Sequence, residues 1–197
     1  MTAVAAIAPA PGAARAPRNA LTLASYVAGT GFVLASAAVL AAFFAIRAQA
    51  DSWPPNEINF DEYLSAMLSA TMLLAVVFAG WASWAVRTGN DRQALAGLAL
   101  AAGMGLAFAN LAWYTGTHSG FGASEHAFGL LLIAAIAIVT AATLSAVLFA
   151  LVALLRTLGR TALPDHELIH ASVRYWFLVA AAWFVSPVAL YGLTSVK

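Results

Sequence analysis

The segment HELIH, from His166 to His170, has the residue types and the spacing of a zinc-dependent hydrolase motif. On a helix, two imidazoles four residues apart share one face and bind a single Zn²⁺ ion, while the glutamate, here Glu167, serves as general base. Asp165 directly precedes the motif and is a favourable N-cap residue, so the sequence predicts that a helix begins here. A membrane metalloenzyme that uses His166 and His170 is therefore one hypothesis for this chain.

The number of available ligands argues against catalysis by this motif. A catalytic zinc ion has three protein ligands and one open position. No His, Asp, Glu or Cys follows His170, and the chain has no cysteine at all. Apart from the motif and its N-cap, Asp91 is the only acidic residue predicted on the same side of the membrane. We therefore interpret the motif as a solvated helix start, where acidic residues suit the positive end of the helix dipole.

A second group of possible ligands consists of His118, Glu125 and His126, which fall within nine residues of one predicted loop. Imidazole suits both copper and zinc, so this group is a candidate metal site. The competing interpretation is a polar loop cap with His126 at the membrane edge, and we favour it. We therefore expect no metal and no other cofactor in this chain, although bound lipid is compatible with its composition.

Five long apolar runs must position these residues. The chain is 63% hydrophobic and only 9% charged, with a mean hydropathy of +0.87, whereas soluble domains have about 25% charged residues. Each run reaches the roughly 20 residues that a membrane-spanning helix needs. The sequence predicts an all-α, polytopic membrane protein: a disordered Ala/Pro-rich tail at 1–20, then one domain of five transmembrane helices at 21–197. The predicted spans are Leu21–Ile46, Tyr63–Val86, Gln93–Thr115, Ala127–Leu155 and Ser172–Leu193.

Cationic residues are distributed unequally between the two sides of the predicted bundle. Two of them, Arg47 and Lys197, fall on one side. Because cytoplasmic segments carry an excess of Lys and Arg, the N-terminus is predicted to be cytoplasmic and the C-terminus outside. The cytoplasmic side would hold the other seven: Arg15, Arg18, Arg87, Arg92, Arg156, Arg160 and Arg174.

The central parts of the five runs contain no acidic, basic or histidine residue. Ionisable side chains inside a membrane mark ion paths and proton relays, so the sequence does not favour a proton or ion carrier. A haem held by histidine at mid-membrane is disfavoured for the same reason, since haem iron needs an axial ligand. A small membrane transporter remains an alternative, although neither inverted repeats nor broken helices are evident.

Small residues predict how these helices pack. Helices in lipid associate through close backbone approach and interhelical hydrogen bonds. Gly97, Ala101 and Gly105 recur at four-residue steps in the third run, and we expect this helix face to meet a partner subunit. Asn110, the most polar residue near the middle of the same run, predicts an interhelical hydrogen bond.

Aromatic and proline landmarks follow a recognisable order along the chain. The first run ends in RAQA at 47–50, and a Trp-Pro-Pro loop follows. A Tyr-Trp pair opens the last run, and a second tryptophan follows seven residues after the first. The pair stands near a predicted membrane border, where amphipathic rings prefer to lie, so we interpret it as an interfacial anchor. The landmarks are Trp53, Pro54, Pro55, Tyr175, Trp176 and Trp183.

This order resembles subunit III of haem-copper (cytochrome c) oxidases, in particular a short, divergent, five-helix actinobacterial form. The resemblance covers nearly the whole chain from about residue 22. The polar residues of the family are missing, since Phe177 and Ala180 stand where the family has histidine and aspartate, and the first run has no acid. Lipid-headgroup binding and help with proton uptake, which depend on those groups, are therefore not carried over.

The resemblance implies a non-catalytic integral subunit in the bacterial plasma membrane that supports assembly and stability of a respiratory haem-copper oxidase. Its partners would be the catalytic subunit, which holds the haem and copper, the other membrane subunits, and lipids; we expect no nucleic acid. An accessory role in another membrane enzyme, such as a nitric-oxide-reductase-like complex, is the alternative within the same class.

Overall fold

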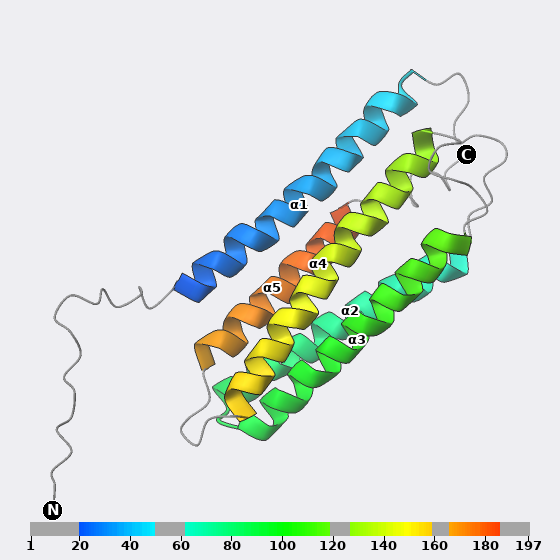
Figure 1. The fold of residues 1–197 in the computed structure, drawn as a ribbon. Coiled ribbons are helices and arrows are strands. Elements are labelled where there is room, and N and C mark those ends of the chain that lie inside the picture. Colours follow the sequence, from blue (N-terminus) through cyan, green and yellow to red (C-terminus); the bar gives the residue numbers. More distant parts are fainter. Residues whose placement is uncertain (1–19, 50–61, 119–126, 159–165, 186–197) are drawn as a thin grey trace, which may run out of the picture.

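Five helices make up the fold, and no strand occurs among the residues that the structure describes (Figure 1). The structure is a computed structural model, and it describes residues 20–49, 62–118, 127–158 and 166–185. All five helices are long and apolar enough to cross a membrane, which confirms the predicted fold class. The helices are α1 (Ala20–Arg47), α2 (Glu62–Arg87), α3 (Asp91–His118), α4 (Ala127–Leu158) and α5 (His166–Val185).

The helix bounds follow the apolar runs closely. The last helix begins at His166, which confirms the helix start predicted for the HELIH segment and lies six residues before the start of the apolar run at Ser172. Hydropathy excludes the polar HELIH segment, but Glu167 in the first turn suits the positive end of the helix dipole. The predicted tail, the Trp-Pro-Pro loop and the loop around His126 lie outside the described residues.

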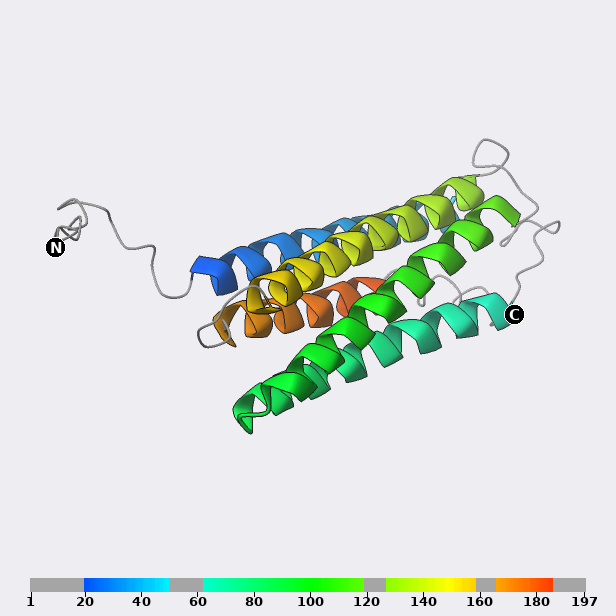
Figure 2. The ribbon, with the colours of Figure 1, turned by 60° about the horizontal axis from the view of Figure 1, so that its bottom comes forward.

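A tight turn joins α2 to α3. Gly89 has a φ of +73°, a left-handed conformation that glycine adopts without steric cost. The amides of Gly89 and Asn90 donate to the carbonyls of Val86 and Ala85, at 3.1 and 2.9 Å, which is the Schellman pattern of a helix C-terminus. Asn90 then caps α3, because its Oδ1 accepts a hydrogen bond from the Gln93 amide at 3.2 Å. The two helices therefore form an antiparallel hairpin (Figure 2).

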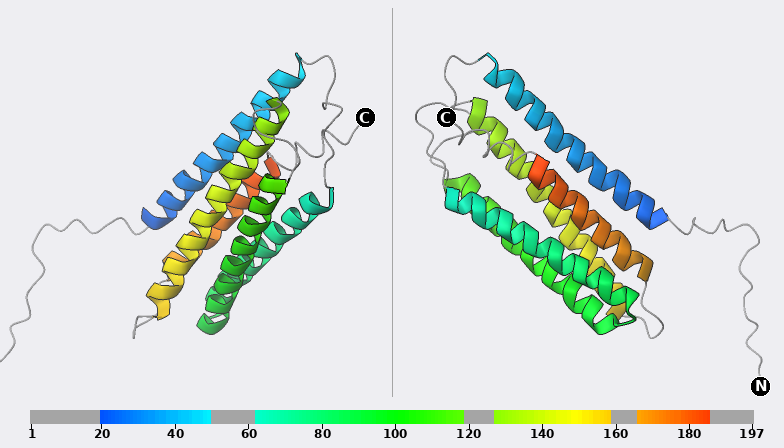
Figure 3. Two further views of the ribbon diagram at one scale, coloured as in Figure 1. Left: turned by 45° about the vertical axis from the view of Figure 1, so that its right-hand side comes forward. Right: turned by 180° about the vertical axis from the view of Figure 1, so that it is seen from behind.

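Helix α5 lies at the centre of the bundle. It packs against α1, α2 and α4, while α3 packs against α2 and α4 (Figure 3). In the most apolar 18-residue window of α5, 61% of residues are buried within the chain, against 17% in α1. The outer surfaces of α1 and α2 are therefore left to lipid or to partner subunits.

Small residues let α3 approach its neighbours closely. A Cβ added to Gly97 would stand 2.9 Å from both the Ala82 amide nitrogen and the Phe78 carbonyl oxygen of α2. One added to Gly105 would stand 2.5 Å from Trp176 Cη2 of α5. Ala101, on the same face, is fully buried. The expectation that this face meets a partner subunit is therefore wrong, because α2 and α5 of the same chain already occupy it.

Candidate functional site

The ends of five helices meet at one end of the bundle, which we call the cationic end. The up-and-down order of the helices places the start of α1, α3 and α5 beside the end of α2 and α4 (Figure 1). Arg87, Arg92, Arg156 and Arg174 lie there among the described residues, whereas Arg47 lies at the opposite end. This is the side that the charge asymmetry predicts to be cytoplasmic.

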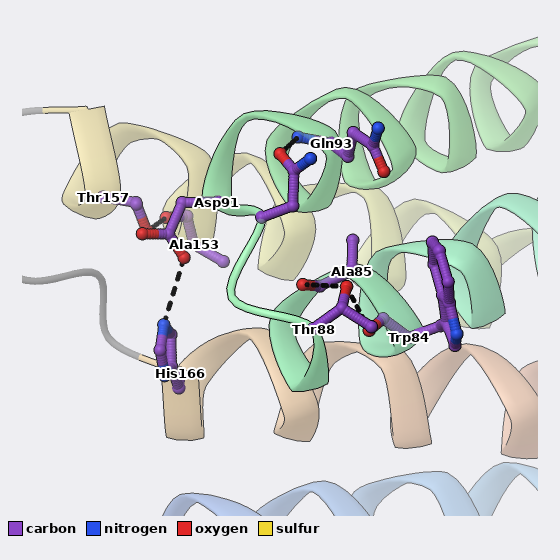
Figure 4. A network of polar contacts seen from close by, with 9 residues as sticks. Trp84, Ala85, Thr88, Asp91, Gln93, Ala153, Thr157 and His166 are labelled. Carbon is purple, nitrogen blue, oxygen red and sulfur yellow. Dashed lines mark hydrogen bonds and ion pairs between the residues drawn. The ribbon is translucent and has the colours of Figure 1, made fainter.

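His166, the first residue of α5, faces α3. Its Nε2 lies 3.2 Å from Asp91 Oδ1, and the two side chains are 47% and 42% exposed (Figure 4). An exposed pair of this kind stabilises a protein by about 0–1 kcal/mol. The contact links the start of α5 to the start of α3.

His170, one turn further along α5, faces α2 instead. Its Nδ1 lies 3.2 Å from Ser83 Oγ. The two imidazoles of the HELIH segment therefore have partners on different helices. Within the described parts of the chain, no group of three or more His, Cys, Asp or Glu residues is placed to hold a metal ion. The described residues therefore offer the zinc hypothesis no third ligand.

The second group of predicted ligands lies at the far end of α3. His118 Nδ1 lies 3.1 Å from the Tyr114 carbonyl oxygen and 2.9 Å from Thr117 Oγ1. Its ring stacks on that of Tyr114 with a centroid separation of 4.2 Å. All of these contacts of His118 are with neighbouring residues at the end of α3. The other two predicted ligands, Glu125 and His126, lie outside the described residues.

An open groove of about 440 Å³ lies at the cationic end between α1 and α5. Arg174 donates a hydrogen bond from Nη1 to Thr22 Oγ1 at 2.8 Å, and it forms no ion pair with any residue that the structure describes. Its guanidinium therefore retains free donors beside a hydroxyl, a phenol and an imidazole. The lining residues are Thr22, Tyr26, Glu167, His170 and Arg174.

This groove can recognise an anion. Planar guanidinium donors match the oxygens of a phosphate, and hydroxyl donors beside them add hydrogen bonds. Glu167, on the same lining, offers a site for a cationic group. Sequence reasoning missed the groove, because Thr22 and Arg174 are 152 residues apart and no local spacing relates them.

The aromatic landmarks of α5 lie in the interior. Tyr175 and Trp176 are 4% and 0% exposed, so their interpretation as interfacial anchors is wrong. The Tyr175 hydroxyl lies 2.6 Å from Ser145 Oγ of α4. Trp183 is fully buried and donates from Nε1 to Ser69 Oγ of α2 at 3.2 Å. These side chains join the central helix to its neighbours. The first landmark group, Trp53, Pro54 and Pro55, lies outside the described residues.

Several threonine hydroxyls within the spans are bonded to their own helix. Thr71, Thr115, Thr143 and Thr157 each donate to the carbonyl four residues earlier, at 2.7–2.9 Å. Such bonds satisfy the hydroxyl locally. In α1 to α4, the acidic, basic and histidine residues among the described ones lie in the first or last turn of the helix.

Comparison with known protein families places the chain beside a family of membrane proteins. The profile of the family described as cytochrome c oxidase subunit III matches residues 26–195. The match begins in the second turn of α1 and includes α2, α3, α4 and α5.

Proposed function

Because the chain belongs to the cytochrome c oxidase subunit III family, we propose that it is a non-catalytic integral subunit of a respiratory haem-copper oxidase, and that it supports assembly and stability of the catalytic subunit. The haem and copper belong to that partner. We propose the bacterial plasma membrane as its location, with the cationic end in the cytoplasm.

One observation supports this proposal independently of the family: the large side chains inside the described spans pack against neighbouring helices. The two large indoles of α5, Trp176 and Trp183, are fully buried. Phe108 packs edge-on against Trp183, with a centroid separation of 5.0 Å. In α1 to α4, the acidic, basic and histidine residues among the described ones lie in the first or last turn, and in α5 they lie within the first nine residues, so they do not form a proton relay across the whole span.

Co-purification tests the proposed function. The tagged chain, extracted from its native membrane with a mild detergent, should carry haem absorbance and the haem-bearing subunit in a fixed ratio. An unrelated tagged membrane protein from the same cells, purified in parallel, controls for incomplete extraction. Recovery of the chain without haem, under conditions in which oxidase activity survives extraction, would contradict the proposal.

We also propose that the groove at Arg174 binds the phosphate-bearing headgroup of a membrane lipid. The groove lies at a helix end, where headgroups are found, and Arg174 has no carboxylate partner among the described residues. A phosphate would occupy its free donors, and an ethanolamine group would suit Glu167.

Native mass spectrometry tests this site. Arg174→Gln should lose a lipid adduct that the unaltered chain retains, whereas Arg156→Gln should keep it. Arg156 is a matched control because it lies at the same end but does not line the groove. Addition of free inorganic phosphate should not displace a lipid. An adduct that survives Arg174→Gln would overturn the headgroup site.

A further inference from the structure

The outward face of α3 combines small residues with one amide. Ala96, Ala99, Gly103, Ala107 and Asn110 are all exposed, and their three- and four-residue steps place them on one helix face. A Cβ added at Gly103 would meet no atom within 4 Å. The face is therefore open, unlike the opposite face of the same helix, which the chain fills itself.

Asn110 falls within the hydrocarbon region when the midpoint of α3 is placed at the bilayer centre. Helix α3 has 28 residues, and at 1.5 Å per residue Asn110 is about 8 Å from its midpoint. The hydrocarbon core extends about 15 Å from the bilayer centre. Trp113 and Tyr114, whose exposed rings suit the interface, follow Asn110 toward the helix end. The amide thus lies on the hydrocarbon side of these aromatic residues.

The Asn110 carboxamide makes no hydrogen bond with any residue that the structure describes. Lipid tails offer no donor or acceptor, so an amide exposed to them is left unsatisfied at a cost in free energy. The side chain is too short to reach the headgroups, unlike lysine or arginine. Its exposure indicates that another protein, rather than lipid, covers this face.

The other outward faces differ from this one. The outward side of α2 carries the bulky residues Leu73, Leu74 and Val77, which suit contact with lipid tails. Helix α1 also has an open glycine, Gly31, but the polar residue beside it, Thr30, carries a hydroxyl and not an amide. Among the described residues, only the α3 face combines small side chains, which allow close approach of another helix, with an amide that has no hydrogen-bond partner.

We propose that this α3 face binds a membrane-spanning helix of the partner subunit. Gly103 and Ala107 allow the two backbones to approach closely, and Asn110 hydrogen-bonds to a carbonyl or polar side chain of the partner helix. The inference rests on the proposed function, because it takes the haem-bearing subunit as the source of that helix.

Two matched variants test the face in the whole complex. Gly103→Leu should lower the haem recovered per tagged chain about tenfold, a loss equivalent to about 1.4 kcal/mol of association. Gly31→Leu, which fills an equally open glycine site on α1, should leave recovery unchanged. Asn110→Leu should also lower recovery, and Asn110→Gln should restore part of it.

A cross-link identifies the occupant directly and does not depend on the variants remaining stable. The chain has no cysteine, so a single cysteine at Ala107 can carry a photoreactive maleimide in intact membranes. An adduct with the haem-bearing subunit supports the proposal. An adduct with a second copy of the chain, or with lipid alone, overturns it. If the unaltered chain co-purifies with haem and Gly103→Leu retains all of that haem, the α3 face is not the binding surface, while the proposed function stands. If the unaltered chain co-purifies with no haem, the proposed function itself fails.

Discussion

Substitution of Gly97 by alanine should destabilise the chain by separating α2 from α3. The added Cβ would stand 2.9 Å from a backbone nitrogen and a backbone oxygen of α2. Backbone atoms cannot rotate away as a side chain can, so the helices must move apart. Overpacking of this kind costs about 1–3 kcal/mol. The helix propensity that alanine gains over glycine offsets about 1 kcal/mol of this cost, which leaves a net loss of about 0–2 kcal/mol. For a chain of this size, a net loss of about 1 kcal/mol lowers the melting temperature by about 2–4 °C.

A second glycine isolates this steric effect. Any glycine-to-alanine change in a helix also gains about 1 kcal/mol of helix propensity, so the comparison needs a site without a neighbour. Gly31 of α1 has no atom within 4 Å of an added Cβ, and Gly31→Ala should leave the melting temperature unchanged or raise it. The melting temperatures of both variants can be measured by heating the tagged chain in detergent and following the folded fraction by size-exclusion chromatography. Equal melting temperatures for the two variants would refute the close contact at Gly97.

Two further predictions concern metal and topology. Replacement of both His166 and His170 by alanine should change the oxidase activity of the host complex by less than about tenfold, the smallest loss typical of an essential metal environment. Stoichiometric zinc in the unaltered chain after chelator washing, lost in the double variant, would instead support the hydrolase hypothesis. Cysteines at Ser52 and Thr88 should react with an impermeant maleimide from opposite sides of intact cells, Ser52 from outside. Labelling of both from one side would contradict the predicted orientation.

Hydropathy alone predicts the five spans of this fold, because each helix must bury about 20 residues in lipid. The apolar run begins only at Ser172, but the N-cap signal before the HELIH segment predicts the start that α5 has at His166. Hydropathy misjudges Tyr175, because an aromatic residue near the end of an apolar run can face either the interface or a neighbouring helix.

The sequence does not predict which face of a helix turns toward the interior of the bundle. Gly97 and Gly103 are both glycines of α3, yet one touches α2 and the other meets no atom of the chain within 4 Å. Which face a helix turns inward depends on the other four helices. The groove at Arg174 depends in the same way on how α1 lies against α5, which no local pattern contains.

The turn between α2 and α3 has a consequence for biogenesis. Only residues 88–90 separate the two helices, and their backbone groups are already bonded to the end of α2 and the start of α3. A connection this short cannot cross the bilayer, so the end of α2 and the start of α3 must lie on the same side. An error in the orientation of one helix would therefore also invert the other.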